Sequence, residues 1–119
     1  MRYLCLVYCE PHVFERMPLE ERKTLDRDSL AYDETLKQSG HMIHAEALES
    51  VARAVTLRVR DGKLSGTDGP FAETKEHLGG FILIEAADME EAKRVAAAIP
   101  MARVGSIEIR PIYDIPTWE

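Results

Sequence analysis

The chain lacks the features that mark membrane, nucleic-acid-binding and disulfide-rich proteins. It has two cysteines in 119 residues, and its 15 Lys and Arg stand against 21 Asp and Glu, for a net charge of −6. This charge, without any basic stripe, opposes binding to a phosphate backbone and excludes nucleic acid as the expected partner. No apolar run approaches the roughly 18 residues of a membrane span, and the N-terminal run is too short for a signal peptide. We therefore expect a cytoplasmic protein.

The two cysteines, Cys5 and Cys9, fall four residues apart in one predicted strand. At roughly 3.3 Å per residue their positions lie about 13 Å apart, which is beyond disulfide reach. We expect both to be buried, reduced thiols. Burial in an apolar strand raises a thiol pKa, so neither suits nucleophilic catalysis.

Metal-binding and cofactor-binding motifs are also missing. His41 and His44 are three residues apart, which places them on opposite faces of a strand, and His12 and His77 stand alone in loops. No HxxxH, CxxC, HExxH or Gly-x-Ser-x-Gly motif occurs, and Gly79-Gly80 precedes a strand without the Lys-Ser/Thr of a phosphate loop. We expect no metal and no cofactor.

Apolar residues make up 45% of the chain and charged residues 30%, which fits one globular domain over residues 1–119. Hydrophobic periodicity and end signals predict strands at 3–9, 41–48, 54–59, 63–65, 79–86 and 106–110, and helices at 18–38 and 88–99. Asp61-Gly62 predicts a tight hairpin, Ser39-Gly40 ends the first helix, and Asp88 caps the second. In the first helix Leu25, Ser29, Tyr32 and Leu36 form one stripe, with Ser29 its odd polar member.

This element order predicts an α+β ferredoxin-like sandwich of βαββαβ type, with both helices on one face of an antiparallel sheet. Alternation along the strands divides their side chains into two sets. The purely apolar sets, expected to face the helices, are Leu4/Leu6, Ile43/Ala45/Ala47, Val55/Leu57/Val59, Ile82/Ile84 and Ile107/Ile109. The complementary sets are Tyr3/Cys5/Val7/Cys9, Met42/His44/Glu46, Thr56/Arg58, Phe81/Leu83/Glu85 and Glu108/Arg110.

The second, mixed set would expose a large apolar patch on a small monomer, so we expect a homodimer that packs two such faces together. The dimer would enclose a pocket lined by Met42, His44, Glu46, Arg58 and Arg110. The alternative reading of these polar side chains is a set of cross-strand ion pairs, each contributing about 0.2–1 kcal/mol.

The most distinctive segment spans residues 67–81, Thr-Asp-Gly-Pro-Phe-Ala-Glu-Thr-Lys-Glu-His-Leu-Gly-Gly-Phe. Asp68 and Gly69 suit a turn, Pro70 stiffens the chain, and Phe71 can insert into the core or into a partner. The loop would then present Glu73, Lys75 and Glu76 on a rigid support, where function tends to lie. The alternative is a plain connecting turn with solvated charges.

These residues resemble the signature of the DGPF-domain branch of the YCII-related family. The resemblance extends to 54–58 with Asp61-Gly62, to Glu90-Glu91-Ala92 and to 105–111, and covers about residues 2–112. It implies a ferredoxin-like fold assembled as a dimeric α+β barrel. The family is largely uncharacterised, and both cofactor-free enzymatic roles and accessory roles beside sigma factors have been suggested within it.

Two functional hypotheses follow. In the first, a cofactor-independent enzyme performs acid–base chemistry on a small molecule near the DGPF loop, with Asp68 or Glu73 as acid or base and His44 as proton relay. Ligand contacts would come from Glu46, Arg58, Phe71, Lys75 and Arg110, the arginines serving an anionic substrate. In the second, the same pocket belongs to a non-catalytic ligand-binding or regulatory module, linked to a sigma factor.

A His on the helix, paired with an Asp, is the active site suggested in the YCII branch. Alignment on Gly40 places Ser29 near that His and Ile99 near a plausible position of that Asp. The resemblance therefore implies that this chain lacks the pair, and that catalytic assignment does not carry over to it.

Overall fold

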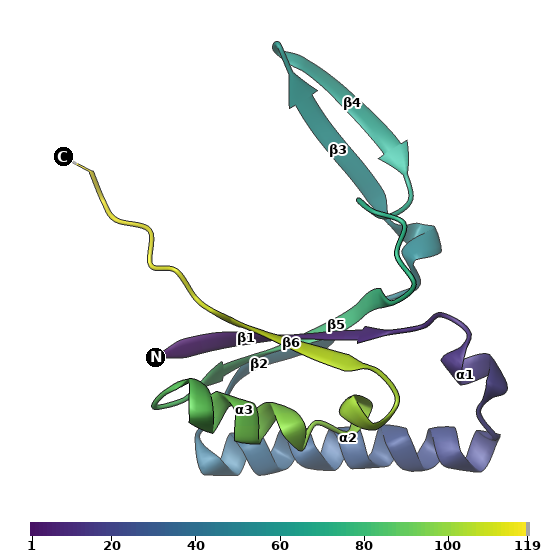
Figure 1. Ribbon diagram of the computed structural model, residues 1–119, viewed down its shortest axis with the longest axis vertical. Helices are drawn as coiled ribbons and strands as arrows, with labels where there is room; N and C mark the ends of the chain where they lie inside the picture. The colour runs from purple at the N-terminus through teal and green to yellow at the C-terminus, as the bar shows by residue number, and fades with distance from the viewer. Residues whose placement is uncertain (119) are drawn as a thin grey trace.

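Strand β1 (Arg2–Cys9) is central in a four-stranded sheet, as its apolar sequence predicts (Figure 1). The computed structural model describes residues 1–118. After β1 come α1 (Val13–Arg16), α2 (Leu19–Ser39), β2 (Met42–Ala47), the short helix η1 (Val51–Arg53), β3 (Val55–Arg60), β4 (Lys63–Asp68), β5 (His77–Glu85), α3 (Met89–Ala97), the short helix η2 (Pro100–Arg103) and β6 (Ser106–Pro111). The mixed α+β class is confirmed.

The four-stranded sheet has the order β2-β5-β1-β6, and each neighbouring pair is antiparallel. Helices α2 and α3 both lie on one face of it (Figure 1). Leu36 of α2 and Val95 of α3 accordingly join Cys5 and Ile84 of the strands in one buried cluster. This arrangement is the sandwich that the element order predicts.

The helix ends follow the local signals in the sequence. Helix α2 ends where Gly40 adopts φ = 80°, and the Gly40 N–H donates to the carbonyls of Leu36 and Lys37. Glycine supplies this left-handed conformation without a Cβ penalty. Asp88 caps α3 by accepting a 2.9 Å hydrogen bond from the Glu91 N–H. Among the described residues, no helix is both long and apolar enough to cross a membrane.

The prediction of which β1 side chains face the helices is wrong. Tyr3, Cys5, Val7 and Cys9 are the buried side chains of this strand, and Leu4 and Leu6 point to the other side. The register gives the reason, because Cys5 pairs with both Ile82 and Ile109, which were correctly assigned to the helix side. Directly paired residues share a sheet face, so Cys5 must face the helices as well.

In β2, a register shift between Met42 and His44 breaks the alternation on which the prediction depended. Met42 packs against the core, whereas Ile43, assigned to the helix side, is 45% exposed. Ala45 packs against the core as expected. A β-bulge adds one residue to a strand. The side chains before the bulge therefore point to the opposite sheet face from the one that strict alternation predicts.

The Asp61-Gly62 hairpin forms as predicted, with φ values of 52° and 73° at the two turn residues. However, β3 and β4 form a separate two-stranded sheet within the described residues and project away from the four-stranded sheet (Figure 1). The expectation that Val55, Leu57 and Val59 face the helices is therefore wrong, and each is at least 60% exposed. The hairpin side chains have no helix to pack against, because the two-stranded sheet lies outside the sandwich.

His41 links the start of β2 to α3. Its Nε2 lies 2.9 Å from Glu91 Oε1, and its Nδ1 lies 2.7 Å from Ser39 Oγ. The ring and the carboxylate are both about three-quarters buried, at 26% and 30% exposure. The contact therefore joins two elements that are far apart in the chain.

We expect Glu91→Ala to lower the free energy of unfolding by about 1 kcal/mol, since a partly buried pair between elements is lost. Glu90→Ala is the matched control, because Glu90 pairs with Lys93 of the same helix at an exposed position. Urea denaturation of both variants measures the difference. Equal stability of the two would contradict a linking role for His41.

Candidate functional site

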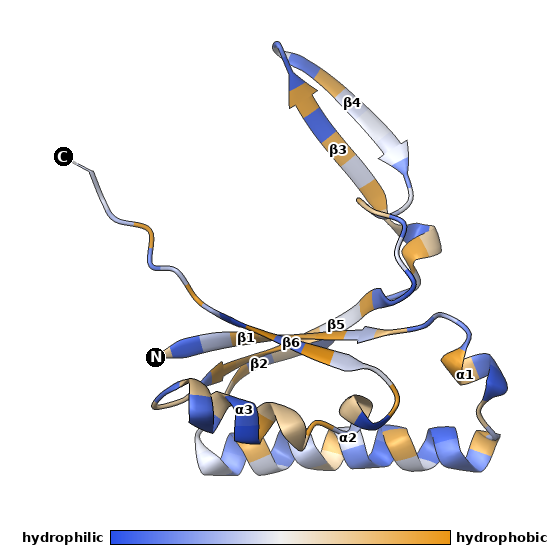
Figure 2. Ribbon diagram, viewed as in Figure 1, coloured by the Kyte–Doolittle hydropathy of each residue, from blue (hydrophilic) through white to orange (hydrophobic). Residues whose placement is uncertain are grey.

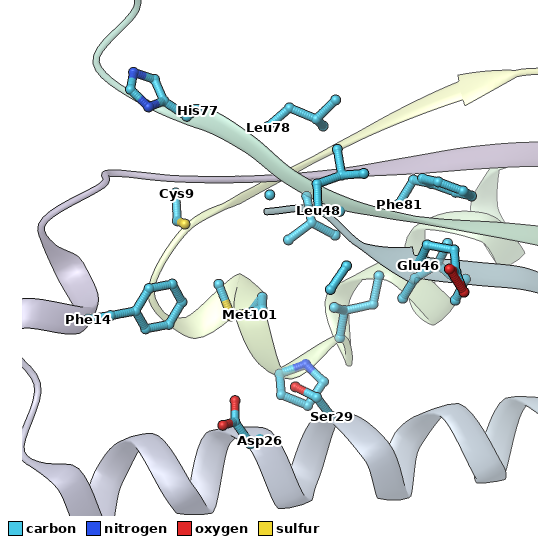
Figure 3. Close-up of a pocket in the computed structure, with 18 of the residues that line it drawn as sticks. Cys9, Phe14, Asp26, Ser29, Glu46, Leu48, His77, Leu78, Phe81 and Met101 are labelled. Carbon is cyan, nitrogen blue, oxygen red and sulfur yellow. The ribbon is translucent and has the colours of Figure 1, made fainter. Parts of the chain in front are cut away.

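A cavity of about 670 Å³ lies between α2 and the helix-facing side of the sheet (Figure 3). We call it the first cavity. In Figure 3, Asp26 and Ser29 rise from α2 toward the sheet, while Cys9, Phe14 and Met101 gather at one end. Apolar residues form much of the remaining wall, among them Val7, Leu30, Leu48, Ile82 and Ile99. Apolar walls with few polar groups are typical of small-molecule sites.

One stripe of α2 supplies polar groups to this cavity. Arg22, Asp26, Ser29 and Asp33 follow one another at intervals of four, three and four residues, and all four line it. This spacing places them on one helix face, and we call the set the polar stripe. The stripe lies directly beside the apolar residues Leu25 and Leu36, which hold α2 against the core. The packing of α2 therefore turns the polar stripe toward the sheet.

The carboxyl group of Asp33, which lines the cavity, has a raised pKa. Burial raises the pKa of its carboxyl group, the nearby Lys37 charge lowers it, and the Glu34 charge raises it. The preceding residue is fixed, since the Tyr32 hydroxyl donates a 2.6 Å hydrogen bond to the Val95 carbonyl of α3. A carboxyl group with a raised pKa, on a rigid helix and facing a cavity, is suited to proton transfer.

Cys9 also lines the cavity, and its thiol is poorly suited to nucleophilic attack. Burial raises the pKa of the Cys9 thiol, and the Glu76 charge raises it further. Burial raises the pKa of Cys5 to about 11. Both cysteines are buried and unbridged, as the sequence predicts.

A second cavity of about 580 Å³ adjoins the first and includes part of the DGPF loop, Pro70, Phe71 and Ala72. The two cavities share wall residues in 48–51 and 77–78. At the root of this loop the Gly69 N–H donates to the Ala54 carbonyl at 2.7 Å, and the Thr56 hydroxyl donates to the Gly69 carbonyl at 3.0 Å. The loop is thus tied to the base of the hairpin beside the cavity.

The predicted acid–base residues lie on three different segments. Asp68 is the last residue of β4, Glu73 is in the exposed loop that follows, and His44 is in β2. The His44 imidazole lies 3.9 Å from Glu46 Oε1 and its ring centre is 6.0 Å from that of Phe81. Among the described residues, no hydrogen bond or ion pair joins the side chains of Asp68, Glu73 and His44 to one another.

The predicted ligand-binding residues are similarly dispersed. The Arg58 guanidinium of β3 lies over the Phe71 ring of the DGPF loop at 5.4 Å, and Lys75 pairs with Glu10 at 3.1 Å. Arg110 lies in β6 opposite Leu4, on the sheet face away from the helices. Glu46 is the member of the predicted set that lines the first cavity.

The sequence contained a signal for the cavity residues that were not predicted. Arg22, Asp26 and Asp33 are spaced so that they lie on the same helix face as Ser29. Ser29 is the one polar member of the predicted apolar stripe. Ser29 and Ile99, the positions expected near the His and Asp suggested in the YCII branch, both line the first cavity. Within residues 1–118, no three His, Cys, Asp or Glu side chains gather closely enough to hold a metal ion.

Comparison with known proteins agrees with this fold. The YCII-related domain model matches residues 1–116. The uncharacterized protein R00369 of Rhizobium meliloti (strain 1021) is 36% identical over 114 residues, which cover 94% of this chain and 92% of that protein. Among solved structures, 5-chloro-2-hydroxyhydroquinone dehydrochlorinase (TftG) from Burkholderia phenoliruptrix AC1100, in complex with 2,5-dihydroxybenzoquinone, is similar with a TM-score of 0.55. That match is 17% identical and covers 95% of this chain and 94% of the other. The chain belongs to the YCII-related domain family.

Proposed function

We propose that the protein is a cofactor-independent enzyme that moves a proton on a small ring compound bound in the first cavity. The observation that carries this proposal is the carboxyl group of Asp33, whose pKa is raised by burial, beside a largely apolar space of about 670 Å³. Such a space accommodates a molecule of drug-like or smaller size. The dehydrochlorinase similar in fold binds 2,5-dihydroxybenzoquinone, and we extend the class of small oxygenated rings to this chain.

In this proposal Asp33 acts as the general base. Its carboxylate takes a proton from a ring carbon next to a carbonyl, the C–H bond breaks, and the electron pair moves to the carbonyl oxygen as an enolate. The protonated carboxyl then returns a proton to the ring. The apolar walls exclude water from the reacting atoms, and Ser29 and Arg22 are placed to orient polar groups of the substrate.

A second location for the same chemistry is the root of the hairpin, with Asp68 or Glu73 as acid or base and His44 as relay. The Arg58–Phe71 stack supports it, because it places a cation and a ring beside the second cavity. The two locations differ in which variant loses activity. Asp68→Asn abolishes turnover only if the second location is correct.

We propose further that the working form is a homodimeric α+β barrel in the cytoplasm. The sheet face away from the helices supports the dimer. Its centre is apolar, formed by the cross-strand pairs Leu4–Leu83 and Leu6–Phe81, and no helix covers it. Cytoplasmic location is supported by the low cysteine content, two in 119 residues, which is unlike a disulfide-rich secreted domain.

The proposal is tested with 2-tetralone, a ring ketone whose C1 protons exchange with solvent through an enolate. In D₂O the protein is expected to accelerate loss of the C1 proton signal in ¹H NMR spectra, above the rate in acetate buffer of equal carboxylate concentration. 2,5-Dihydroxybenzoquinone should slow this exchange by competition. Binding of the quinone without acceleration would support a non-catalytic ligand-binding module, and absence of both would refute the proposal.

A further inference from the structure

The hairpin of β3 and β4 carries an apolar surface that its own chain does not cover. Val55, Leu57 and Val59 alternate with polar residues along β3, and Leu64 of β4 pairs with Val59 on the same face. We call these four side chains the apolar hairpin face; each is between 60% and 68% exposed. Figure 2 shows hydrophobic segments alternating with hydrophilic ones along β3. An isolated two-stranded hairpin is at best marginally stable in water, so this face requires a cover.

The molecule is also more extended than a single domain of its size. Its radius of gyration is 16.7 Å, against about 13.5 Å expected for a compact domain of this length. The hairpin rises from the side of the sheet opposite the helices, and the chain after β6 leaves on the same side (Figure 1). That terminal segment exposes Tyr113 and Ile115 at 74% and 79%. Two arms therefore stand over a sheet face that no helix covers.

The sheet face between the arms has an apolar centre with polar and charged side chains at its edges. One row across it reads Glu46, Phe81, Leu6 and Glu108, and the next row reads His44, Leu83, Leu4 and Arg110. The polar face of the hairpin carries Arg58, Arg60 and Lys63. A hairpin with six-residue strands is about 20 Å long, and four strands at about 4.8 Å spacing are about 14 Å wide. The hairpin is thus long enough to cross such a sheet.

We propose that the apolar hairpin face of each chain packs on the sheet face of a second copy, so that the two hairpins clasp the dimer. A second copy is the favoured occupant because one chain carries both an uncovered apolar arm and an uncovered apolar sheet face, and the arm is long enough to cross that face. In a dimer with two-fold symmetry, each chain covers both of these surfaces of the other chain. No uncovered apolar surface of this kind then remains to bind further copies. This inference rests on the homodimer of the proposed function and adds the segment that holds it.

The clasp also connects assembly to the candidate site. The hairpin ends at Asp68, and the next residues form the DGPF loop that lines the second cavity. Arg58 of the hairpin lies on Phe71 of that loop. Docking of the hairpin on the second copy fixes the position of this wall.

The test is the double variant Leu57→Lys with Leu64→Lys, measured by sedimentation equilibrium together with far-UV circular dichroism. Burial of two unpaired charges should raise the dimer dissociation constant by about 100-fold or more, with the helical signal retained. The matched control is Ser65→Lys with Thr67→Lys, which adds the same charge to the polar face of the same hairpin and should remain dimeric. A dimeric Leu57/Leu64 variant would overturn the clasp alone, and a monomeric wild-type protein would overturn the proposed dimer as well.

A second measurement covers the case in which the double variant does not fold. Wild-type protein is mixed with a ¹⁵N-labelled copy, and carbodiimide joins Lys63 to nearby carboxylates. We expect cross-linked peptides that contain one labelled and one unlabelled partner, because the hairpin tip contacts the other chain. Cross-links formed only within one chain would overturn the clasp.

Discussion

Replacing Asp33 by Asn is expected to lower the exchange rate at C1 of 2-tetralone by about 10²- to 10⁴-fold, the usual contribution of a positioned general base. The amide keeps the size of the side chain but cannot accept the proton. Glu21→Gln is the control, because it makes the same chemical change in the exposed first turn of α2. If Asp33→Asn keeps the wild-type rate while Asp68→Asn loses it, the hairpin location is correct and the first cavity is not the reaction site.

The pH dependence of the wild-type rate should identify the same group. Because burial raises the pKa of Asp33 above its ordinary value of 3.8, the rate is expected to rise with pH through a midpoint above 3.8. The rising limb should be absent in Asp33→Asn. A midpoint at or below 3.8 would point to a solvated carboxylate outside the cavity.

The Asp33→Asn variant should be less active than the wild type but more stable at neutral pH. A carboxyl group whose pKa is raised on folding binds its proton more tightly in the folded state. Its contribution to stability is therefore full below pH 3.8 and is lost as the pH rises through the raised folded value. At pH 7, Asp33→Asn is expected to unfold at a slightly higher temperature than the wild type, with the advantage disappearing below pH 3.8. A gain in stability with a loss of activity is the behaviour of a functional residue held in an unfavourable environment.

The elements of the fold could be predicted from the sequence because their ends carry local signals. Gly40, Asp88 and Asp61-Gly62 specify a helix end, a helix start and a turn through their own backbone and side-chain chemistry. The facing of β1 could not be predicted in this way. Tyr3/Cys5/Val7/Cys9 and Leu4/Leu6 are both apolar enough to be buried, and only pairing with β5 and β6 decides between them.

The candidate site was harder to predict for a related reason. The DGPF segment has an unusual composition and was therefore predicted to be the functional segment. Asp26 and Asp33, in contrast, have the sequence context of ordinary surface residues on a charged helix. Their role depends on how far α2 is rotated against the sheet, which the buried Leu25 and Leu36 determine. The position of the hairpin could not be predicted from one chain either. The alternation of apolar residues along it indicates a buried face but does not identify the surface that covers this face.

Gly105→Ala should be the most destabilising of the glycine-to-alanine changes, and the reason is a close approach of backbones. A Cβ added at Gly105 would lie 2.1 Å from the Tyr8 carbonyl oxygen and 3.1 Å from Cys9 Cβ. The residue cannot shift freely, since its N–H donates a 2.8 Å hydrogen bond to the Met101 carbonyl. Relief therefore requires the end of β1 to separate from the start of β6.

We expect Gly105→Ala to lower the free energy of unfolding by about 3 kcal/mol or more, the upper end of overpacking effects. Gly79→Ala is the matched control. Its added Cβ would meet atoms only at 3.8 and 3.9 Å, which is ordinary contact, and its effect should stay within about 0.5 kcal/mol. Urea denaturation followed by circular dichroism measures both.

Gly80→Ala supplies an intermediate case if Gly105→Ala does not fold. Its Cβ would lie 2.8 Å from the Glu46 carbonyl oxygen, so the edge strand β2 must move away from β5. An edge strand can shift more easily than the central β1, and we therefore expect the order of destabilisation Gly105, then Gly80, then Gly79. Because Cys9 and Glu46 both line the first cavity, the first two variants should also weaken binding of 2,5-dihydroxybenzoquinone. If Gly79→Ala proved as damaging as Gly105→Ala, the close approach of β6 to the end of β1 would not be what requires a glycine at position 105.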